Sequence, residues 1–267
     1  MSLSINTNVE ALDAQRNLNN TENSLAMSME RLSSGLKINS AADDVAGYAI
    51  NQRLQSQING LEQAQQNSQD AVALAQTAQG ALNEVEQMLQ RVRELAVQYE
   101  NGTNSATDKE AIEGEVTQLN AEVKRVGETT AFNGISLLSA AGEITFQVGA
   151  NVGAEEKIGV KTVKLSEAVK SVKLSEAKSL EKIEANIAKV AEVAAEFGSV
   201  QDRLQYTQAN LATYTQNLSA AQSTIVDVNM AAEVTNFTKD QVLQQAGVSV
   251  LTQANHLPQA VLKLLEG

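Results

Sequence analysis

The chain of 267 residues contains no cysteine and no tryptophan, and only one proline and one histidine. The absence of cysteine excludes a disulfide framework and thiol chemistry. The single His256 excludes a zinc site built from histidines and disfavours a Ser–His–Asp triad. Aromatic residues make up only 3% of the chain, too few for a conventional globular core of this length. The composition is therefore poorly suited to a compact enzyme, and we expect no catalytic residues, no metal and no cofactor.

Basic residues are also scarce. Lys and Arg number 20 against 32 Asp and Glu, which gives a formal net charge of −12. This balance disfavours nucleic acid and anionic membranes as partners. The first residues have neither a basic segment nor a continuous apolar one, so we expect no cleaved signal peptide. No run approaches the roughly 18 apolar residues that a membrane-spanning helix needs.

Long helices are predicted from what the chain does contain. Gln and Asn together number 47, and apolar residues recur in steps of three and four. This spacing predicts one helix from Val45 to about Tyr99, ended by Asn101-Gly102. Thr107 and Glu110 have the spacing of a capping box that would begin the next helix, which ends near Gly127. The clearest heptad positions are Leu82, Val85, Leu89, Val92, Ala96 and Tyr99.

The periodicity changes after Phe132-Asn133-Gly134. Residues 143–148 alternate between apolar and polar, which predicts a strand, and residues 158–163 suggest a returning strand. A short repeat follows: the six residues Val-Lys-Leu-Ser-Glu-Ala occur at 163–168 and, nine residues later, at 172–177. We interpret residues 136–178 as a short connector with a small β-hairpin.

A second long helix is predicted from about Ser179 to residue 225. Half of its heptad positions after Phe197 are Gln or Thr. Polar residues at such positions specify register at a cost in stability, so we expect them to keep the packing of the long helices adjustable. We call this set the polar row: Gln201, Gln208, Thr215 and Gln222.

Both ends of the chain are predicted to be helical, each with one apolar stripe and nothing in its own segment to cover it. They must pair with each other or with other copies of the chain. The expected assembly residues are Ile5, Val9, Leu12, Leu25, Met29, Leu32, Leu243, Ala246, Val250, Leu257, Val261 and Leu264.

The predicted fold is mainly α: a long antiparallel coiled-coil helical bundle with paired N- and C-terminal helices and a small β-hairpin connector. Residues 1–35 and 232–267 would form an inner domain of terminal helices. Residues 36–45 and 226–231 would be linkers, and residues 46–225 a helical shell domain that carries the connector.

Several blocks resemble the signatures of bacterial flagellins. They are Leu-Ser-Ser-Gly-Leu-Lys-Ile-Asn-Ser-Ala-Ala-Asp-Asp-Val-Ala-Gly at 32–47, Gln-Arg-Val-Arg-Glu-Leu-Ala-Val-Gln at 90–98, Phe-Asn-Gly at 132–134, Phe-Gln-Val-Gly-Ala-Asn at 146–151 and the tail at 243–265. The sequence departs from the family in lacking a large variable outer domain and in ending with Glu266-Gly267 where a basic end is usual.

The resemblance implies an extracellular protein of the bacterial flagellum that polymerises with copies of itself and is exported unfolded by the flagellar type III apparatus. It also implies an export chaperone at the C-terminal helices, and hook-associated and cap proteins as partners.

Positions that match Arg91, Leu95 and Glu115 resemble the surface that the flagellin-sensing Toll-like receptor of the host contacts, which is also similar to a subunit contact in the filament. Gln90 and Gln98 complete this expected set. Ordinary solvated helix charges are the simpler interpretation of the arginines.

Three other interpretations fit parts of the sequence. A minor junction or hook-associated protein would share the terminal helices, but the intact block at 90–98 and the short middle argue against it. A protease insert of the His-Glu-x-x-His type is excluded by the single histidine. A non-flagellar coiled-coil scaffold fits the periodicity but does not explain the signature blocks.

Overall fold

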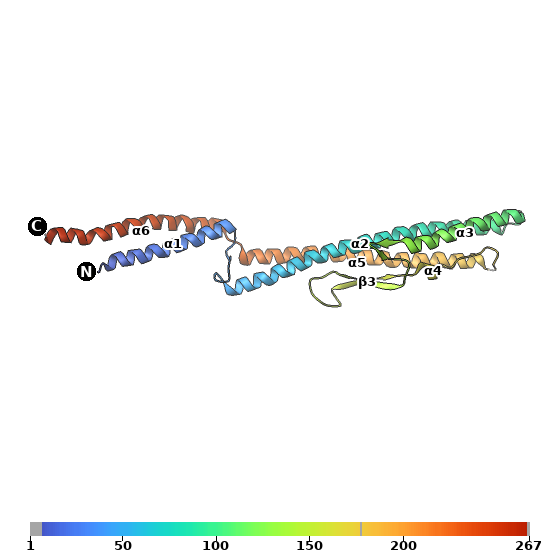
Figure 1. The fold of residues 1–267 in the computed structure, drawn as a ribbon, viewed down its shortest axis with the longest axis horizontal. Coiled ribbons are helices and arrows are strands. Elements are labelled where there is room, and N and C mark those ends of the chain that lie inside the picture. The colour runs from blue at the N-terminus through green and yellow to red at the C-terminus, as the bar shows by residue number, and fades with distance from the viewer. Residues whose placement is uncertain (1–6, 177, 266–267) are drawn as a thin grey trace. The chain divides into compact units, whose positions relative to one another are not determined.

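The computed structural model describes residues 7–176 and 178–265, with side chains described as far as His256. The chain divides into two compact units: unit 1 contains Met1–Ser56 and Leu218–Gly267, and unit 2 contains Gln57–Asn217. The helices are α1 (Val9–Ser34), α2 (Val45–Tyr99), α3 (Ala106–Thr129), α4 (Leu165–Ala168), α5 (Ser179–Val226) and α6 (Met230–Leu265) (Figure 1). No helix among these residues is both long and apolar enough to span a membrane.

Unit 1 is built on the antiparallel pair of α1 and α6, which lie side by side (Figure 1). The side chain of Asn8 caps the start of α1, and Gly35 ends this helix in the left-handed conformation with φ 73°. Just beyond Gly35, Leu36 pairs with Asp227 in an isolated antiparallel bridge. The bridge joins the chain after α1 to the chain before α6.

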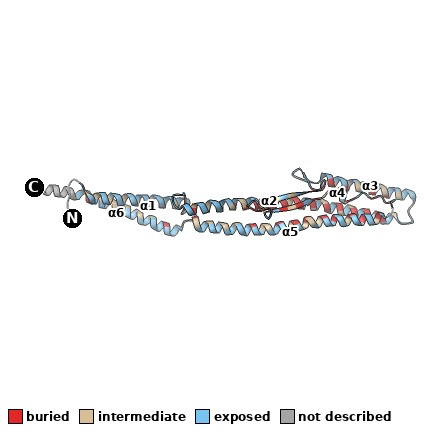
Figure 2. Cartoon of the chain, turned by 90° about the horizontal axis from the view of Figure 1, so that it is seen from below, coloured by how far each residue is buried: buried red, intermediate tan, exposed pale blue. Residues whose placement is uncertain are grey.

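Unit 2 has an extensive apolar core. Figure 2 shows buried residues concentrated where α2 and α5 run beside α3 and the strands, whereas α1 and α6 are mostly exposed. The core reaches complete burial at several large side chains, because α2 is covered by α5 on one side and by α3 or the connector on another. Fully buried members include Leu74, Leu82, Leu89, Leu95, Leu137, Leu138, Leu165, Leu174, Phe197 and Leu204.

Two small antiparallel hairpins follow α3. Strands β1 (Ala131–Phe132) and β2 (Ile135–Ser136) flank Asn133-Gly134, where both residues have positive φ, as a type I′ turn requires. Strands β3 (Gly142–Gln147) and β4 (Lys157–Thr162) form the predicted hairpin, with Ile144 paired to Val160. Its inward-facing β4 residues are buried as the alternation predicts.

Both copies of the repeat at 163–168 and 172–177 pack the connector against the helices of unit 2. Leu165 of the first copy and Leu174 of the second are each almost completely buried, in two different apolar clusters. The Asn186 side chain both donates to the carbonyl of Lys170 and accepts from its N–H, at 2.8 and 3.2 Å. The repeat therefore provides two successive segments that hold the connector against the apolar clusters, and the first of them contains the single helical turn α4.

The predicted fold class is confirmed, including the paired terminal helices and the hairpin. The capping box was predicted two residues too late. Ser105, rather than Thr107, caps α3, and it exchanges hydrogen bonds with Asp108. Ser105 takes this role because its backbone is extended, with φ −71° and ψ 167°, as an N-cap requires, whereas Thr107 already lies inside the helix. The predicted division into domains stays a prediction. The boundaries between the two compact units fall at other positions in the sequence, after residues 56 and 217.

Candidate functional site

The first candidate surface lies where α3 folds back along α2; we call it the α2–α3 patch, and its predicted members are Gln90, Arg91, Leu95, Gln98 and Glu115. Arg91 connects the two helices, since its Nε donates to Glu115 Oε1 at 3.0 Å and its Nη1 to Glu94 Oε2 at 3.1 Å. The hydrogen bond to Glu115 raises the pKa of Arg91, and the one to Glu94 adds to the effect. All three side chains are about half exposed or more, so solvent screens the pairs and they contribute little to stability.

The geometry of this patch follows from the turn between α2 and α3. Asn104 donates from its side chain to the Gln98 carbonyl at 2.5 Å and from its backbone to the Asn101 carbonyl at 3.2 Å. These bonds close the turn before Ser105 starts α3. A second arginine, Arg93, pairs with Glu184 of α5 at 3.1 Å. Two arginines on α2 thus reach two different neighbouring helices.

Leu95 was expected, from the family resemblance, to lie on the contacted surface of the patch, and the exposure that this requires is not found. It is only 2% exposed and belongs to the cluster that contains Ile112 and Val116 of α3. Leu95 comes four residues after Arg91 and so lies on the same face of the helix, but this face turns toward α3. Arg91 is long enough to reach out of the interface, whereas Leu95 remains inside it. Leu95 supports the patch from beneath and offers no surface to a partner.

The exposed valine at this end of α2 is Val97, which was not predicted. It is 59% exposed and lines an open hollow of about 550 Å³ together with Gln90, Arg93, Glu94 and Ile187. Val97 lies outside the heptad positions Val92, Ala96 and Tyr99, so its position alone could have marked it as an exposed apolar residue. Gln90 and Gln98 are exposed as expected.

The second candidate surface is the pair of terminal helices. Their interface contains small and polar residues: Ser28 Oγ donates to Glu233 Oε1 at 2.6 Å, and Glu233 is only 7% exposed. Asn8 Nδ2 donates to the Ala254 carbonyl at 2.8 Å. Gly247 lets α6 approach α1, because a Cβ there would lie 3.3 Å from Leu18 Cδ1. The two helices meet closely, but through a narrow and partly polar contact.

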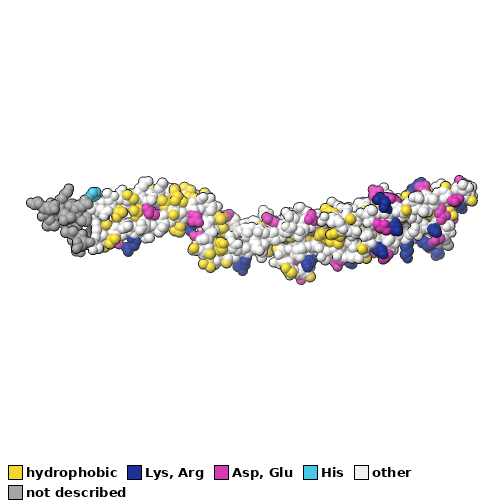
Figure 3. Space-filling model, in the orientation of Figure 1, with side chains coloured by type: hydrophobic (Ala, Val, Ile, Leu, Met, Phe, Trp, Pro, Cys, Tyr) yellow, Lys and Arg dark blue, Asp and Glu magenta, His cyan; other side chains and the backbone are white. Residues whose placement is uncertain are grey.

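The predicted assembly residues mostly point away from this contact. Leu25 and Leu32 are half-buried between the helices. By contrast, the exposed members are Val9, Leu12, Met29, Leu243, Ala246 and Val250. Further exposed apolar residues extend the α6 surface: Val234, Val242 and Val248. Figure 3 shows apolar side chains gathered over α1 and α6, while charged ones gather at the α3 end of unit 2. Ile5 lies outside the described residues, as do the side chains of Leu257, Val261 and Leu264.

The polar row along α5 is half-buried at each of its four positions. Thr215 Oγ1 is buried without a hydrogen-bond partner in the structure. In unit 1, Gln222 Nε2 donates to Asn51 Oδ1 at 2.7 Å and to Gln55 Oε1 at 2.8 Å. The row therefore contains one well-bonded residue and one that loses a hydrogen bond on burial.

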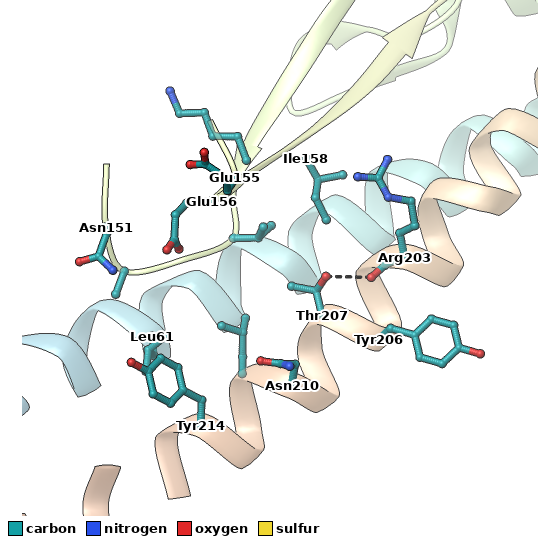
Figure 4. Close-up of a pocket in the computed structure, with 14 residues that line it drawn as sticks. Leu61, Asn151, Glu155, Glu156, Ile158, Arg203, Tyr206, Thr207, Asn210 and Tyr214 are labelled. Atoms are coloured by element: carbon teal, nitrogen blue, oxygen red, sulfur yellow. Dashed lines mark hydrogen bonds between the residues drawn. The ribbon is translucent and has the colours of Figure 1, made fainter. Parts of the chain in front are cut away.

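An open groove of about 600 Å³ lies in unit 2 between the end of the β3–β4 hairpin and α5. Figure 4 shows Glu155 and Glu156 on the hairpin side and Arg203, Tyr206 and Tyr214 along α5. The loop between β3 and β4 approaches α2 closely at Gly60, where a Cβ would lie 2.9 Å from Ala150 Cβ. The groove combines both charge signs and shows no arrangement of nucleophile and base.

Two adjacent carboxylates, Asp43 and Asp44, serve the backbone before α2. Asp43 accepts from the N–H groups of Asn39 and Ser40 and from the Ser40 hydroxyl, and the bonds from Ser40 lower its pKa. Asp44 accepts from Ala46 and Gly47 at the start of α2. Across the described residues, no group of three or more His, Cys, Asp or Glu side chains could hold a metal ion.

Comparison with known proteins gives concordant results for both ends of the chain. Residues 5–143 match the family model of the bacterial flagellin N-terminal helical region, and residues 180–265 that of the bacterial flagellin C-terminal helical region. Flagellin of Halalkalibacterium halodurans is 44% identical over 98% of this chain and 99% of its own length. Flagellin of Bacillus subtilis is 38% identical with the same coverage.

Solved structures agree with the fold. The crystal structure of Bacillus cereus flagellin superposes with a TM-score of 0.50 at 30% identity, covering 59% of this chain and 94% of that one. A putative flagellar hook-associated protein from Vibrio parahaemolyticus gives a TM-score of 0.58 over 69% of this chain and 99% of that one. At 13% identity, the second likeness concerns the fold alone.

Proposed function

The chain belongs to the bacterial flagellin family and is a structural subunit of the flagellar filament, and we propose that the outward faces of α1 and α6 drive its polymerisation. One observation carries this proposal. The two helices bury Ser28 and Glu233 between them and only half-bury Leu25 and Leu32, and they leave other apolar residues exposed on their outer sides. Exposed apolar surface of this extent marks an interaction site in a soluble protein.

The energy available on these faces is large enough for assembly. Full burial of a Val or Leu side chain contributes about 1.5–3 kcal/mol. Val242, Leu243 and Val250 alone are each roughly half exposed or more. Their burial against other copies can offset the ordering of the terminal segments. We therefore expect the outward faces of α1 and α6 to be covered only in the assembled filament.

Paired variants of α6 test the proposal. Leu243→Gln with Val250→Gln should abolish filament growth from seeds, while circular dichroism of the monomer stays unchanged because both residues are exposed. Gln245→Ala with Ser249→Ala changes two equally exposed polar residues on the same helix and should grow filaments normally. Normal growth of the first variant, seen by negative-stain microscopy, would show that α6 does not carry the contact.

We further propose that the chain is exported unfolded through the flagellar type III apparatus without a cleaved signal peptide, with an export chaperone on the C-terminal helix. The apolar side of α6 supports this, because it offers a chaperone the same residues that later meet other subunits. Hook-associated and cap proteins would meet the ends of the filament. The chaperone should bind the wild-type protein, and its affinity for the Leu243→Gln, Val250→Gln variant should be much lower.

The names of the relatives, flagellins and filament core proteins, favour a filament subunit over a junction protein. We propose no enzymatic activity.

Recognition by a host Toll-like receptor is proposed for the exposed part of the α2–α3 patch. Arg91 and Glu115 are half exposed and fixed to each other. Val97 is also exposed and shares a hollow with Glu94, which accepts a hydrogen bond from Arg91. A fixed charged pair linked in this way to an exposed apolar residue suits a small binding hot spot. Arg91→Ala with Glu115→Ala should reduce activation of receptor-bearing reporter cells without unfolding unit 2. Lys124→Ala with Glu128→Ala removes another exposed pair on α3 and should retain full potency.

A further inference from the structure

Two Asn–Gly dipeptides lie on exposed turns of unit 2, and the structure places them in different backbone settings. Asn101-Gly102 lies in the turn between α2 and α3, and Asn133-Gly134 in the two-residue turn between β1 and β2. We propose that Asn101 is a site of spontaneous deamidation in the folded protein and that the β1–β2 hairpin protects Asn133. This proposal is independent of the assembly and receptor roles given above.

The reaction requires only the chain and water. The backbone nitrogen of Gly102 attacks Cγ of Asn101, and a bond forms between them while the side-chain amide leaves as ammonia. The product is a five-membered succinimide. Water then opens the ring at either carbonyl and leaves aspartate, or isoaspartate in which the main chain runs through the former side chain. In sum, an amide NH₂ is exchanged for OH and one negative charge is gained.

The surroundings of Asn101 favour this attack. Asn101, Gly102 and Thr103 are all exposed, and a Cβ built on Gly102 would meet nothing within 4 Å. No side chain therefore crowds Gly102, and since the same holds for Gly134, the difference between the two sites lies in the backbone around them. The Thr103 N–H donates to Asn101 Oδ1 at 3.4 Å. A donor at this oxygen stabilises the negative charge that develops there when Cγ is attacked.

The setting of Asn133 opposes the same attack. Its φ of 48° and the φ of 80° at Gly134 define the turn conformation, and Phe132 pairs with Ile135 directly beside it. Leu137 N–H also bonds to the Thr130 carbonyl at 3.1 Å, below the turn. Ring closure needs rotation about the Cα–C bond of the asparagine, which would break this pairing. The hairpin must open before Asn133 can react.

Deamidation at Asn101 would alter the α2–α3 turn. The new charge stands just beyond the C-terminus of α2, where the helix dipole disfavours an anion. In the isoaspartyl product, the carbonyl that accepts from Asn104 N–H becomes a free carboxylate on a side branch. The turn that sets α3 against α2 is thereby loosened.

The experiment compares both sites within one molecule. Full-length protein is incubated at mildly alkaline pH, and conversion of each asparagine is followed by peptide mass spectrometry. We expect Asn101 to convert about tenfold faster than Asn133, because rotation at Asn101 breaks the turn bond from Asn104 N–H, whereas rotation at Asn133 disrupts a paired hairpin. Gly102→Ala should slow the reaction by placing a methyl group beside the attacking nitrogen, and Asn101→Gln should remove it.

Denatured protein supplies the reference. In concentrated urea the hairpin is lost, and the two sites should convert at nearly equal rates because each is followed by glycine. Phe132→Ala, which removes a side chain packed on the core, should raise the rate at Asn133 only. The proposal is overturned if Asn133 converts as fast as Asn101 in the folded protein. It is also overturned if both sites convert in urea and neither does so in the folded chain.

Discussion

Units 1 and 2 are both made of long antiparallel helices, yet they bury their apolar residues in opposite ways. In unit 2, α2, α3 and α5 surround side chains such as Leu82 and Leu204, which have no exposed surface. In unit 1, α1 and α6 meet through Ser28, Glu233 and Gly247. Many apolar residues of unit 1, such as Leu12 and Val250, instead face outward.

This difference shows that helical periodicity alone does not decide what a helix buries its apolar side against. A third element covers the second face of α2 in unit 2. The two helices of unit 1 have only each other among the described residues, so a second apolar face on either one stays open. We therefore expect unit 2 to be stable by its own packing and unit 1 to be stabilised by further copies of the chain.

The largest expected effect comes from removing unit 1. A fragment without residues 1–35 and 232–267 should form no filaments and should remain soluble, helical and monomeric, because the core of unit 2 is retained. Seeded growth and sedimentation measure the outcome. Filaments formed by the fragment would contradict the assignment of assembly to the terminal helices.

Single truncations to alanine should separate the two units next. Leu82→Ala in unit 2 should lower the free energy of unfolding by about 2–5 kcal/mol, because it leaves a cavity at a fully buried site. Leu243→Ala in unit 1 should change it by less than about 0.5 kcal/mol in the monomer, since this side chain is 46% exposed. Urea unfolding of both variants measures the difference. Equal losses would mean that unit 1 is packed as unit 2 is.

How far the sequence predicts the structure follows the same division. The limits of α2 and α5 and the β3–β4 hairpin could be predicted, because periodicity and turn residues are local signals. The burial of Leu95 could not be predicted, because it depends on α3 returning along α2 at a particular rotation. The same holds for α1 and α6. Their apolar stripes are visible in the sequence, but whether a stripe faces the partner helix or other subunits depends on which residues allow close approach.

The polar row offers a smaller test. Thr215→Val keeps the shape of the side chain and removes a buried hydroxyl that lacks a hydrogen bond, so it should stabilise unit 2 by about 1 kcal/mol. Gln222→Leu should give no such gain, because it removes bonds to Asn51 and Gln55. Thermal unfolding of the two variants checks this order. We also expect filaments of a variant with Gln201→Leu, Gln208→Leu and Thr215→Leu to keep one helical form when pH or salt changes, since the register of the long helices becomes fixed.

The smallest effect concerns the start of α3 and its dependence on pH. Hydrogen bonds from the Ser105 side chain and backbone lower the pKa of Asp108 below its ordinary value. A carboxyl whose pKa is lower in the folded state stabilises that state above its unfolded pKa of about 3.9. The contribution is lost as the pH falls through the still lower folded value. Asp108→Ala should therefore destabilise unit 2 near neutral pH and match the wild type in strong acid. Glu110→Ala removes the same charge from the same end of α3 and should have a weaker effect, because the structure places the capping box at Ser105 and Asp108. Urea unfolding at both pH values distinguishes the variants, and a larger loss for Glu110→Ala would favour the box at Thr107 and Glu110 instead.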